Sequence, residues 1–386
     1  MDKNINDISN KEKIAIVVVG YNRIDSLSRL LQSLAVSKLP NSVPLVISVD
    51  CSGNEELYDY VKSFRWQFGD KYVFIQSKRL GLKEHILKCG DLSKYFKAIV
   101  LLEDDIYVSP FFYDYIEATV NKYSTDTQIC GIGLFKNEIN GYAKIPLEFL
   151  NDGADVFLWQ EVCTWGECWT YSMWSEFREW YDENENFNFE KIDIPQEIKM
   201  WKNAWSRYLL AYMIQTEKYF LYPQISLATN FNDCGVHVNE LNNTYQVNML
   251  YGSKQYILPE FAELNKYDIY CANSKLYALL NMSQAELTID FYNLKEKKNY
   301  KRWILTSAIL NYKIVKSFGL NLHPYEVNIM VNNSGQGLFL YDTKIRCKNI
   351  EKNALYSYFY GNLRLNIIIK GMIGFLRNKF ISRIKL

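Results

Sequence analysis

The sequence predicts an α/β fold with a mostly parallel central sheet, and two features of residues 13–105 support that prediction. Short apolar runs, which are typical of buried strands, alternate with segments whose leucines have helical spacing. Each run also ends in glycine or polar residues, where a strand would meet a loop. Strand–helix repeats of this kind form parallel sheets. The expected strands are residues 13–20, 44–50, 71–77 and 97–105, with one more at 129–135.

Helices are expected between these strands. The first follows an Asp25/Ser26 cap and carries its leucines on one face, and the next two cover residues 54–64 and 81–96. Residues 181–193 are acidic and rich in Asn, which predicts an exposed loop. Farther along, residues 274–287 have helical spacing and residues 326–331 resemble a strand.

The length of 386 residues accommodates more than one domain, and the composition changes along the chain. Seven of the nine tryptophans fall between residues 155 and 240, and a basic segment closes the chain. We therefore expect a main α/β domain over residues 11–250, a C-terminal extension over 251–360, and a basic amphipathic helix over 361–386.

Composition argues against several classes of protein. With 44 basic and 43 acidic residues the formal charge is +1, which gives no general reason to expect nucleic acid as a partner. The eight cysteines are scattered without a CxxC pair, so free thiols in a reducing cytoplasm are the simplest interpretation. The polar N-terminus predicts no signal peptide, and no apolar run is long enough to predict a transmembrane helix.

The strongest chemical signal is the acidic run Glu103-Asp104-Asp105 at the end of the fourth strand. Parallel sheets bind ligands beyond the carboxyl ends of their strands. Hard divalent cations such as Mg²⁺ or Mn²⁺ take carboxylate oxygens together with substrate phosphates. Asp50 at the end of the second strand can accept hydrogen bonds from a base or a ribose, and Arg23 after the first strand can bind a diphosphate.

Two common nucleotide-binding motifs are absent from the sequence. The first strand–helix turn reads GYNRID and lacks the GxGxxG of dinucleotide-binding domains. No GxxxxGK[ST] occurs, which excludes a P-loop kinase.

Several segments together resemble glycosyltransferases of the nucleotide-diphospho-sugar transferase (GT-A) fold. The likeness extends to the eukaryotic N-acetylglucosaminyltransferases that start complex N-glycan branches and to bacterial glycosyltransferases of surface-polysaccharide clusters. It covers roughly residues 13–240, in the order and approximate spacing of that family. The matching segments are AIVVVGYNR, PLVISVDCSGNEE, AIVLLEDDIYVSPFFYDYI, CGIGLFKNEING and YPQISLATNFNDCGVH.

The resemblance implies a UDP-type sugar donor, a divalent metal (Mn²⁺ or Mg²⁺) and an inverting transfer. It implies that Asp105 binds the metal, with Glu103 and Asp104 near the ribose and phosphates. It also implies that Asp50 binds the base and that Arg23 binds the base or the diphosphate. Two histidines are implied to contact the nucleotide sugar: His85 in the helix after the third strand, and His237 in a donor-covering loop.

An inverting transfer needs a general base that deprotonates the acceptor hydroxyl. In the resembling families this is an Asp within a Trp-bounded motif, but here the corresponding stretch reads Trp201-Lys202-Asn203-Ala204-Trp205 and contains no acid. Glu167 and Glu197 are the nearest candidates. An enzyme that has diverged or lost activity is the third possibility.

The acceptor side is predicted from two further segments. The Trp-rich stretch TWGECWTYSMW can form a platform for a glycan, or it can be a helix packed on the sheet. The C-terminal helix, basic and apolar, can lie on an anionic membrane surface or dock on the protein. Attachment at the inner face of the membrane would suit a lipid-linked glycan acceptor, as in bacterial surface-polysaccharide or lipooligosaccharide synthesis.

Two other functions are compatible with parts of this pattern. A sugar-nucleotide nucleotidyltransferase also has an acidic metal site on an α/β sheet, but the GYNRIDS turn lacks the Gly-rich basic loop of those enzymes. A non-catalytic relative that binds nucleotide sugars or glycans would account for the missing acid in WKNAW.

Overall fold

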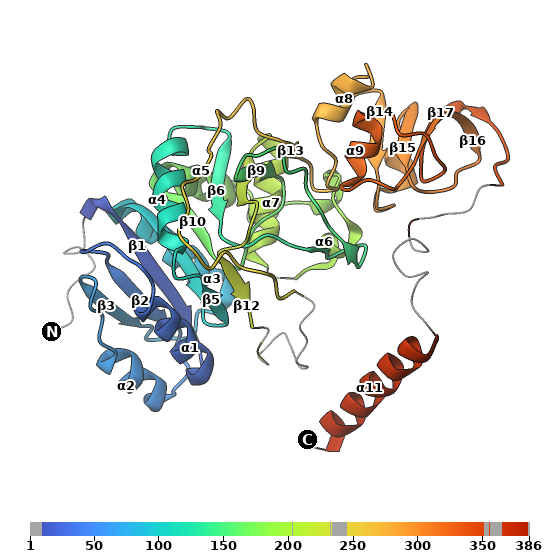
Figure 1. Ribbon diagram of the computed structural model, residues 1–386. Helices are drawn as coiled ribbons and strands as arrows, with labels where there is room; N and C mark the ends of the chain where they lie inside the picture. The colour runs from blue at the N-terminus through green and yellow to red at the C-terminus, as the bar shows by residue number, and fades with distance from the viewer. Residues whose placement is uncertain are drawn as a thin grey trace. The chain divides into compact units, whose positions relative to one another are not determined.

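The computed structural model describes residues 10–202, 204–231, 233, 245–350, 355 and 365–384. The chain divides into two compact units (Figure 1). The first contains the described residues of Met1–Glu138, Asn151–Asp233 and Asn243–Lys275, and the second those of Ile139–Leu150 and Leu276–Leu386. The division differs from the expected one: residues 251–275 belong to the first unit, and residues 139–150 belong to the second.

The first unit is built on a nine-stranded sheet in the order β13-β9-β11-β6-β10-β4-β1-β2-β3. A separate two-stranded antiparallel sheet pairs β5 (Ile106–Val108), which follows β4 in the chain, with β12 (Ala228–Asn230). The strands of the large sheet are β1 (Asn10–Gly20), β2 (Leu45–Val49), β3 (Lys71–Ile75), β4 (Phe96–Glu103), β6 (Ile129–Gly133), β9 (Val156–Trp159), β10 (Glu167–Thr170), β11 (Tyr219–Pro223) and β13 (Lys266–Tyr267).

Most of the pairings in this sheet are parallel. β1 pairs in parallel with both β2 and β4, and β2 with β3, while β10 is antiparallel to its neighbours β4 and β6. The expected strands at 13–20, 44–50, 71–77, 97–105 and 129–135 are all present, with shorter limits at several ends. The predicted fold class, α/β with a mostly parallel central sheet, is confirmed.

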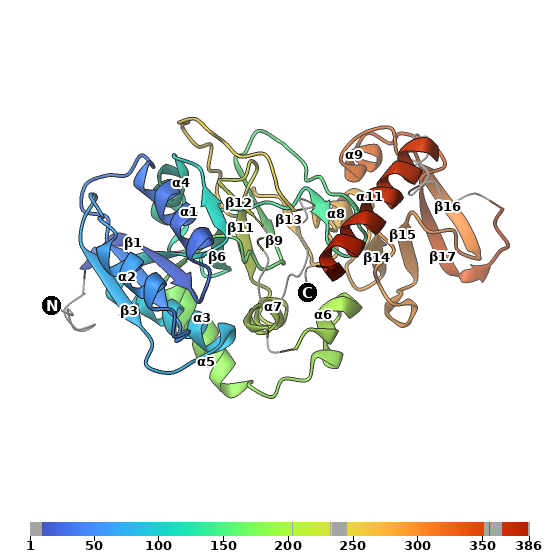
Figure 2. The same ribbon diagram turned by 90° about the horizontal axis from the view of Figure 1, so that it is seen from below.

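Helices cover both faces of the sheet. Figure 2 shows α1 and α4 on one side and α3, α5 and α7 on the other. Side chains define several helix starts: Asn54 accepts a 3.1 Å hydrogen bond from the Leu57 N–H, and Thr170 accepts one of 3.3 Å from Met173. The helices are α1 (Ile24–Ala35), α2 (Glu55–Ser63), α3 (Leu82–Gly90), α4 (Phe112–Tyr123), α5 (Tyr171–Glu183), α6 (Gln196–Met200) and α7 (Trp205–Gln215).

Tryptophans form the core between β10 and the helices that cover it. The buried Trp169 ring lies 4.7 Å from Trp174 of α5 and 5.9 Å from Trp205 of α7, measured between centroids. Tilted and edge-on aromatic pairs at these distances stabilise the fold beyond the area that they bury. The seven described cysteines form no disulfide.

The second unit contains a four-stranded sheet in the order β14-β15-β17-β16. Its strands are β14 (Leu287–Asp290), β15 (Trp303–Thr306), β16 (Tyr312–Phe318) and β17 (Leu338–Arg346), and a second, two-stranded sheet pairs β7 (Ile139–Asn140) with β8 (Ile145–Pro146). The C-terminal extension expected over residues 251–360 thus includes a small β-rich unit.

The expected strand at residues 326–331 is wrong, because this segment is the helix α9 (Tyr325–Met330). Tyr325 and Ile329 are both buried, at the i, i+4 spacing of one helical face. The Asn328 amide donates to the Leu322 carbonyl at 2.7 Å and holds the preceding turn. The sequence EVNIMV alternates like a strand, but these contacts select the helix.

Two other expected elements also differ in the structure. The predicted helix at 274–287 is limited to α8 (Lys275–Leu279), and soon afterwards Asn281 has the left-handed φ of 53°, which does not continue a helix. Residues 181–193 include the end of α5 and a buried Phe189, so they are only partly an exposed loop.

The C-terminal helix α11 spans Leu365–Ile384. Ile367, Ile368 and Ile369 are all at least 42% exposed, and three consecutive positions cover a wide arc of a helix, so the apolar residues are not confined to one narrow face. Of the helices in the described ranges, none combines the length and apolar character needed to cross a bilayer.

Gly90, at the end of α3, provides a test of the packing against α5. A Cβ at this position would lie 2.0 Å from Cζ2 of the Trp174 ring, which is itself fixed among other aromatics. We expect Gly90→Ala to lower the free energy of unfolding by about 1–3 kcal/mol, as overpacking of a core does. Urea denaturation measures this change.

The matched control is Gly252→Ala, whose added Cβ would meet no atom within 4 Å. Its free energy of unfolding should stay within about 0.5 kcal/mol of the unchanged chain. Equal stability of the two variants would contradict the described packing of α3 on α5.

Candidate functional site

The candidate site lies where β1, β2 and β4 end. In the parallel register Val19 is opposite Glu103, and Gly20 is opposite Val49. The loops that follow these strands therefore leave the sheet at the same edge. They meet directly, since the Asp50 N–H donates to the Gly20 carbonyl at 2.9 Å. This edge brings together three groups predicted from the sequence: Arg23, Asp50 and the acidic run after β4.

Arg23 binds the two aspartates of that run. Its Nη2 donates to Asp104 Oδ1 and, at 3.1 Å, to Asp105 Oδ2, while Nε lies 3.4 Å from Asp104 Oδ2. The side chain of Asp104 is 7% exposed and that of Asp105 is 17% exposed. The arginine thus compensates negative charge at a place that water reaches poorly.

Burial and mutual repulsion change the ionisation of this cluster. Burial raises the pKa of Asp104 to about 6, against the opposing effect of the hydrogen bond and charge of Arg23. Burial and the charges of Asp105 and Asp104 raise the pKa of Glu103 to about 8. For Arg23, burial lowers the pKa, but the hydrogen bond and charge of Asp104 together with Asp105 raise it above its ordinary value. Additional positive charge is therefore favourable here.

Asp50 is a buried carboxylate whose oxygens accept hydrogen bonds from three backbone amides. Oδ1 accepts from Cys51 and Leu80, each at 2.8 Å, and Oδ2 accepts from Gly81 at 2.9 Å. These bonds fix the loop that leads into α3 beside the end of β2. The sequence predicts a base-binding carboxylate at this position, and the structure gives it a positioning role in the same loop.

The two histidines predicted to contact the nucleotide have different outcomes. His85 is buried, and its Nε2 lies 2.7 Å from Ser48 Oγ beneath the sheet edge. Burial lowers the pKa of His85 to about 4, and Lys88 contributes while Asp50 opposes, so the ring is neutral at neutral pH. This ring supports the loop from below and is not exposed toward a ligand. His237 lies outside the described residues.

Asp233 and Arg29 extend the charged network, and the sequence reasoning did not identify either residue. Asp233 Oδ2 accepts from Ser26 Oγ at 2.7 Å and pairs with Arg29, and the Asp233 carbonyl accepts from Arg23 Nη1 at 3.2 Å. The Phe231 N–H donates to the Asp105 carbonyl at 2.9 Å. The only sequence signal was the position of Asp233 inside the matching segment YPQISLATNFNDCGVH.

The residues present fit a divalent cation that is shared with a phosphate ligand. Within the described residues, no three His, Cys, Asp or Glu side chains are grouped as a complete metal site. Mg²⁺ and similar ions are commonly held by one or two carboxylates plus substrate phosphates, and Asp105, the more exposed of the two aspartates, provides that kind of donor. Glu103 and Asp104 lie in the same turn, and a cation bound there would lower their raised pKa values.

Glu167, a candidate base, lies inside the sheet. It is 0% exposed on β10, where it pairs with Leu101 of β4 and Gly133 of β6. Among the described residues neither carboxylate oxygen has a hydrogen-bond partner. Burial and the charge of Glu103 raise the pKa of Glu167 well above its ordinary value. The nearby Gly166 backbone lowers this pKa slightly, although its geometry is not that of a normal hydrogen bond. Its burial argues against contact with an acceptor.

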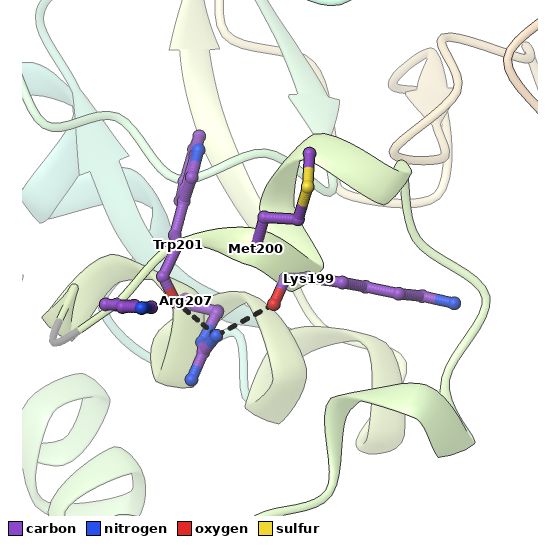
Figure 3. Close-up of a pocket in the computed structure, with 5 residues that line it drawn as sticks. Lys199, Met200, Trp201 and Arg207 are labelled. Atoms are coloured by element: carbon purple, nitrogen blue, oxygen red, sulfur yellow. Dashed lines mark hydrogen bonds between the residues drawn. The ribbon is translucent and has the colours of Figure 1, made fainter.

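Trp201 and Lys202, which begin the segment WKNAW where the family's base was expected, border a surface pocket (Figure 3). Trp201 is 39% exposed there, beside the exposed Met200. Arg207 of α7 holds the segment by donating to the carbonyls of Trp201 and, at 3.1 Å, Lys199. Glu197, the other candidate base, is exposed on α6, four residues before Trp201. The pocket is lined by cationic, apolar and aromatic side chains: Lys199, Met200, Trp201, Lys202 and Arg207.

The Trp-rich stretch predicted as an acceptor platform is mostly core. Trp169 is buried in the strand β10, and Trp174 is buried in α5, so only the second half of the stretch is the helix packed on the sheet that the alternative described. Trp165 is partly exposed, and its ring centroid lies 4.6 Å from Phe135 and 5.5 Å from Tyr245.

The sequence matches no family model and no curated protein. The structure aligns in part with TarS of S. aureus in complex with UDP-GlcNAc, with a TM-score of 0.29 and 19% identity over 36% of this chain and 38% of that chain. For GalNAc-T7 with UDP, GalNAc and Mn²⁺ the TM-score is 0.38, with 14% identity over 56% of this chain and 43% of that chain.

The mannosyltransferase PcManGT from Pyrobaculum calidifontis, in complex with GDP-Man and Mn²⁺, aligns with a TM-score of 0.34 and 10% identity, over 56% of this chain and 58% of that chain. This chain therefore covers less than two thirds of the length of each of these proteins. Alignments with TM-scores below 0.5 do not identify the chemistry of the site. That chemistry has to follow from this chain's own residues.

Glu167 yields a pH-dependent prediction. Its folded pKa lies well above 4.5, so the folded protein must keep it protonated while the unfolded chain ionises. Stability is therefore lost as pH rises above the unfolded pKa, by up to about 1.4 kcal/mol per pH unit. Glu167→Gln, neutral at every pH, should escape this loss and be more stable than the unchanged chain at pH 8 but not at pH 4.

Urea denaturation of both chains across that pH range tests this prediction. Glu185→Gln, at an exposed position, is the control and should follow the unchanged chain at every pH. A difference between Glu167→Gln and the unchanged chain that does not vary with pH would contradict a protonated buried carboxyl.

Proposed function

We propose that this chain is a metal-dependent glycosyltransferase that moves a sugar from a nucleotide-sugar donor, UDP-linked, to a glycan acceptor. The observation that carries the proposal is the acidic turn Glu103–Asp105 at the carboxyl edge of the sheet, bound by Arg23, with Asp50 after β2 at the same edge. This edge is where parallel sheets bind nucleotides, and hard cations suit its oxygen donors. The alignments to proteins solved with UDP, GDP-Man and Mn²⁺ are compatible with it.

In this proposal the donor side consists of groups already placed at the edge. Asp105 holds Mn²⁺ or Mg²⁺, and Glu103 and Asp104 face the ribose and phosphates. A bound cation supplies compensation for the charge that develops on the leaving nucleoside diphosphate. Arg23 lies close enough to the same turn to add charge-assisted hydrogen bonds to a phosphate. Asp50 contributes to donor binding by fixing the loop before α3. Its carboxylate oxygens can also accept a further hydrogen bond from the base of the nucleotide.

The acceptor side is assigned to the segment around Trp201. An inverting transfer requires one base near the attacking hydroxyl. Glu197 is exposed on the helix that leads into Trp201, whereas Glu167 is enclosed in the sheet. We therefore assign Glu197 as the candidate base. A non-catalytic binding protein is the second candidate function, favoured by the absence of an acid from WKNAW.

The assignment to bacterial surface-polysaccharide or lipooligosaccharide synthesis rests on α11. This helix exposes Lys370 and Arg377 among apolar side chains, and basic side chains near an anionic membrane surface are attracted to it. A peripheral position at the inner face of the membrane would give the enzyme access to a lipid-linked glycan.

Asp105→Asn tests the metal role. The substitution keeps the shape of the side chain but removes the charge that attracts the cation. We expect Mn²⁺-dependent affinity for UDP, measured by calorimetry, to fall by about 10–100-fold, and metal-dependent hydrolysis of a panel of UDP-, GDP- and dTDP-sugars to be lost.

Asp59→Asn, at an exposed position on α2, is the matched control and should leave UDP affinity and hydrolysis unchanged. Full-rate hydrolysis by Asp105→Asn would exclude the metal role. Binding of UDP with Mn²⁺ but no turnover of any donor, with or without acceptors, would favour the non-catalytic alternative.

The membrane assignment has its own test. Replacing Lys370 and Arg377 by glutamine removes two positive charges from α11, each worth about 1 kcal/mol at an anionic surface. Co-sedimentation with phosphatidylglycerol-containing vesicles should weaken by roughly 30-fold. Phosphatidylcholine vesicles serve as the control, and equal binding to both vesicle types by the unchanged chain would contradict an electrostatic contribution.

A further inference from the structure

The balanced charge of the whole chain conceals a strong segregation along it. Residues 1–294 contain 27 Lys/Arg and 39 Asp/Glu, whereas residues 295–386 contain 17 Lys/Arg and four Asp/Glu. The second part includes β15, β16 and β17 of the second unit. A basic region of this size, within a chain of net charge +1, points to a negatively charged partner for the second unit.

The structure places part of this charge on one edge of the four-stranded sheet. β16 is the last strand in the order β14-β15-β17-β16, and it exposes Lys313 and Lys316. Its neighbour β17 ends in the exposed residues Lys344 and Arg346, and Arg302 directly precedes β15. We call these five residues the basic strip: Arg302, Lys313, Lys316, Lys344 and Arg346.

Aromatic rings support three cations of the basic strip. The guanidinium carbon of Arg302 lies 4.6 Å from the Trp303 ring centroid, and that of Arg346 lies 5.9 Å from Tyr312. The Lys316 ammonium lies 5.0 Å from Phe318. Such contacts hold long side chains in place without neutralising their charge.

Among the residues that the structure describes, the carboxylate of Asp342 lies within the strip. Asp342 is opposite both Trp303 and Lys313 in the strand register, and its Oδ2 lies 3.7 Å from Arg302 Nη2. The Asp342 side chain is 10% exposed and also caps the Lys344 N–H at 3.0 Å. One buried acid cannot neutralise five exposed cations, so the strip keeps a large positive charge toward solvent.

We propose that the basic strip binds an anionic glycan chain, so that the second unit holds a charged acceptor polymer. The identity of the ligand as a glycan rests on the proposed function, whereas its negative charge follows from the strip itself. Cations spread over the adjacent strands β15, β17 and β16 match an extended chain with repeated phosphate, sulfate or carboxylate groups better than one small ion.

The aromatic rings distinguish this surface from a site for single-stranded nucleic acid. Such sites stack bases on free ring faces. Here the rings of Trp303 and Tyr312 each have a guanidinium over them, and Phe318 is fully buried. The groups presented to a ligand are thus the cations.

The test uses the full chain and fluorescently labelled dextran sulfate, a sulfated glycan, with neutral dextran as the uncharged counterpart. We expect anisotropy to show binding to dextran sulfate that weakens as salt increases, and little binding to dextran. Lys313→Gln with Lys316→Gln should weaken the affinity about tenfold and reduce its salt dependence.

The matched control is Lys38→Gln with Lys62→Gln, which removes the same charge from exposed positions of the first unit and should bind dextran sulfate like the unchanged chain. Unchanged binding by the β16 variant would overturn the proposal. So would binding of a thymidine oligonucleotide as tight as that of dextran sulfate, or a β16 variant that loses binding only to phosphatidylglycerol vesicles.

Hydrolysis of nucleotide sugars provides a separate readout. If the chain hydrolyses no donor yet binds dextran sulfate through the strip, the proposed function fails and the glycan-binding surface remains. If donors are hydrolysed and the β16 variant binds dextran sulfate normally, only the inference about the basic strip fails.

Discussion

The pairing of Arg23 with Asp104 and Asp105 is the interaction on which the rest of the candidate site depends. Three consecutive acids end a buried strand, and burial together with repulsion by Asp105 and Asp104 raises the pKa of Glu103 to about 8. One guanidinium reaches both aspartates and opposes the rise in the pKa of Asp104. Without this cation, the turn after β4 would carry uncompensated charge in a poorly hydrated place. The same electrostatic demand makes the turn suited to a divalent ion.

The loops around this pair are fixed by side chains that bind backbone atoms. Asp50 binds the amides of Leu80 and Gly81, and Arg23 binds the Asp233 carbonyl. Segments far apart in sequence are therefore held at one edge by carboxylate–amide and guanidinium–carbonyl bonds. Such bonds are directional, so they fix where the functional groups point as well as holding the fold together.

The two units have opposite electrostatic characters. The first carries the acidic turn and an excess of acids, and the second carries an exposed basic edge. The acidic turn and the basic edge therefore belong to different units of the chain.

The sequence by itself determined the alternation of strands and helices and the grouping of Arg23, Asp50 and Glu103–Asp105, because apolar periodicity and the carboxyl-edge rule are local or topological. Only the tertiary structure decided what depends on distant contacts. Glu167, a plausible base in TWGECW, is enclosed because β10 inserts antiparallel between β4 and β6. Residues 326–331 form a helix because Tyr325 and Ile329 are buried together on one of its faces. Asp233 meets Arg23 across 210 residues, a contact that no local sequence pattern predicts.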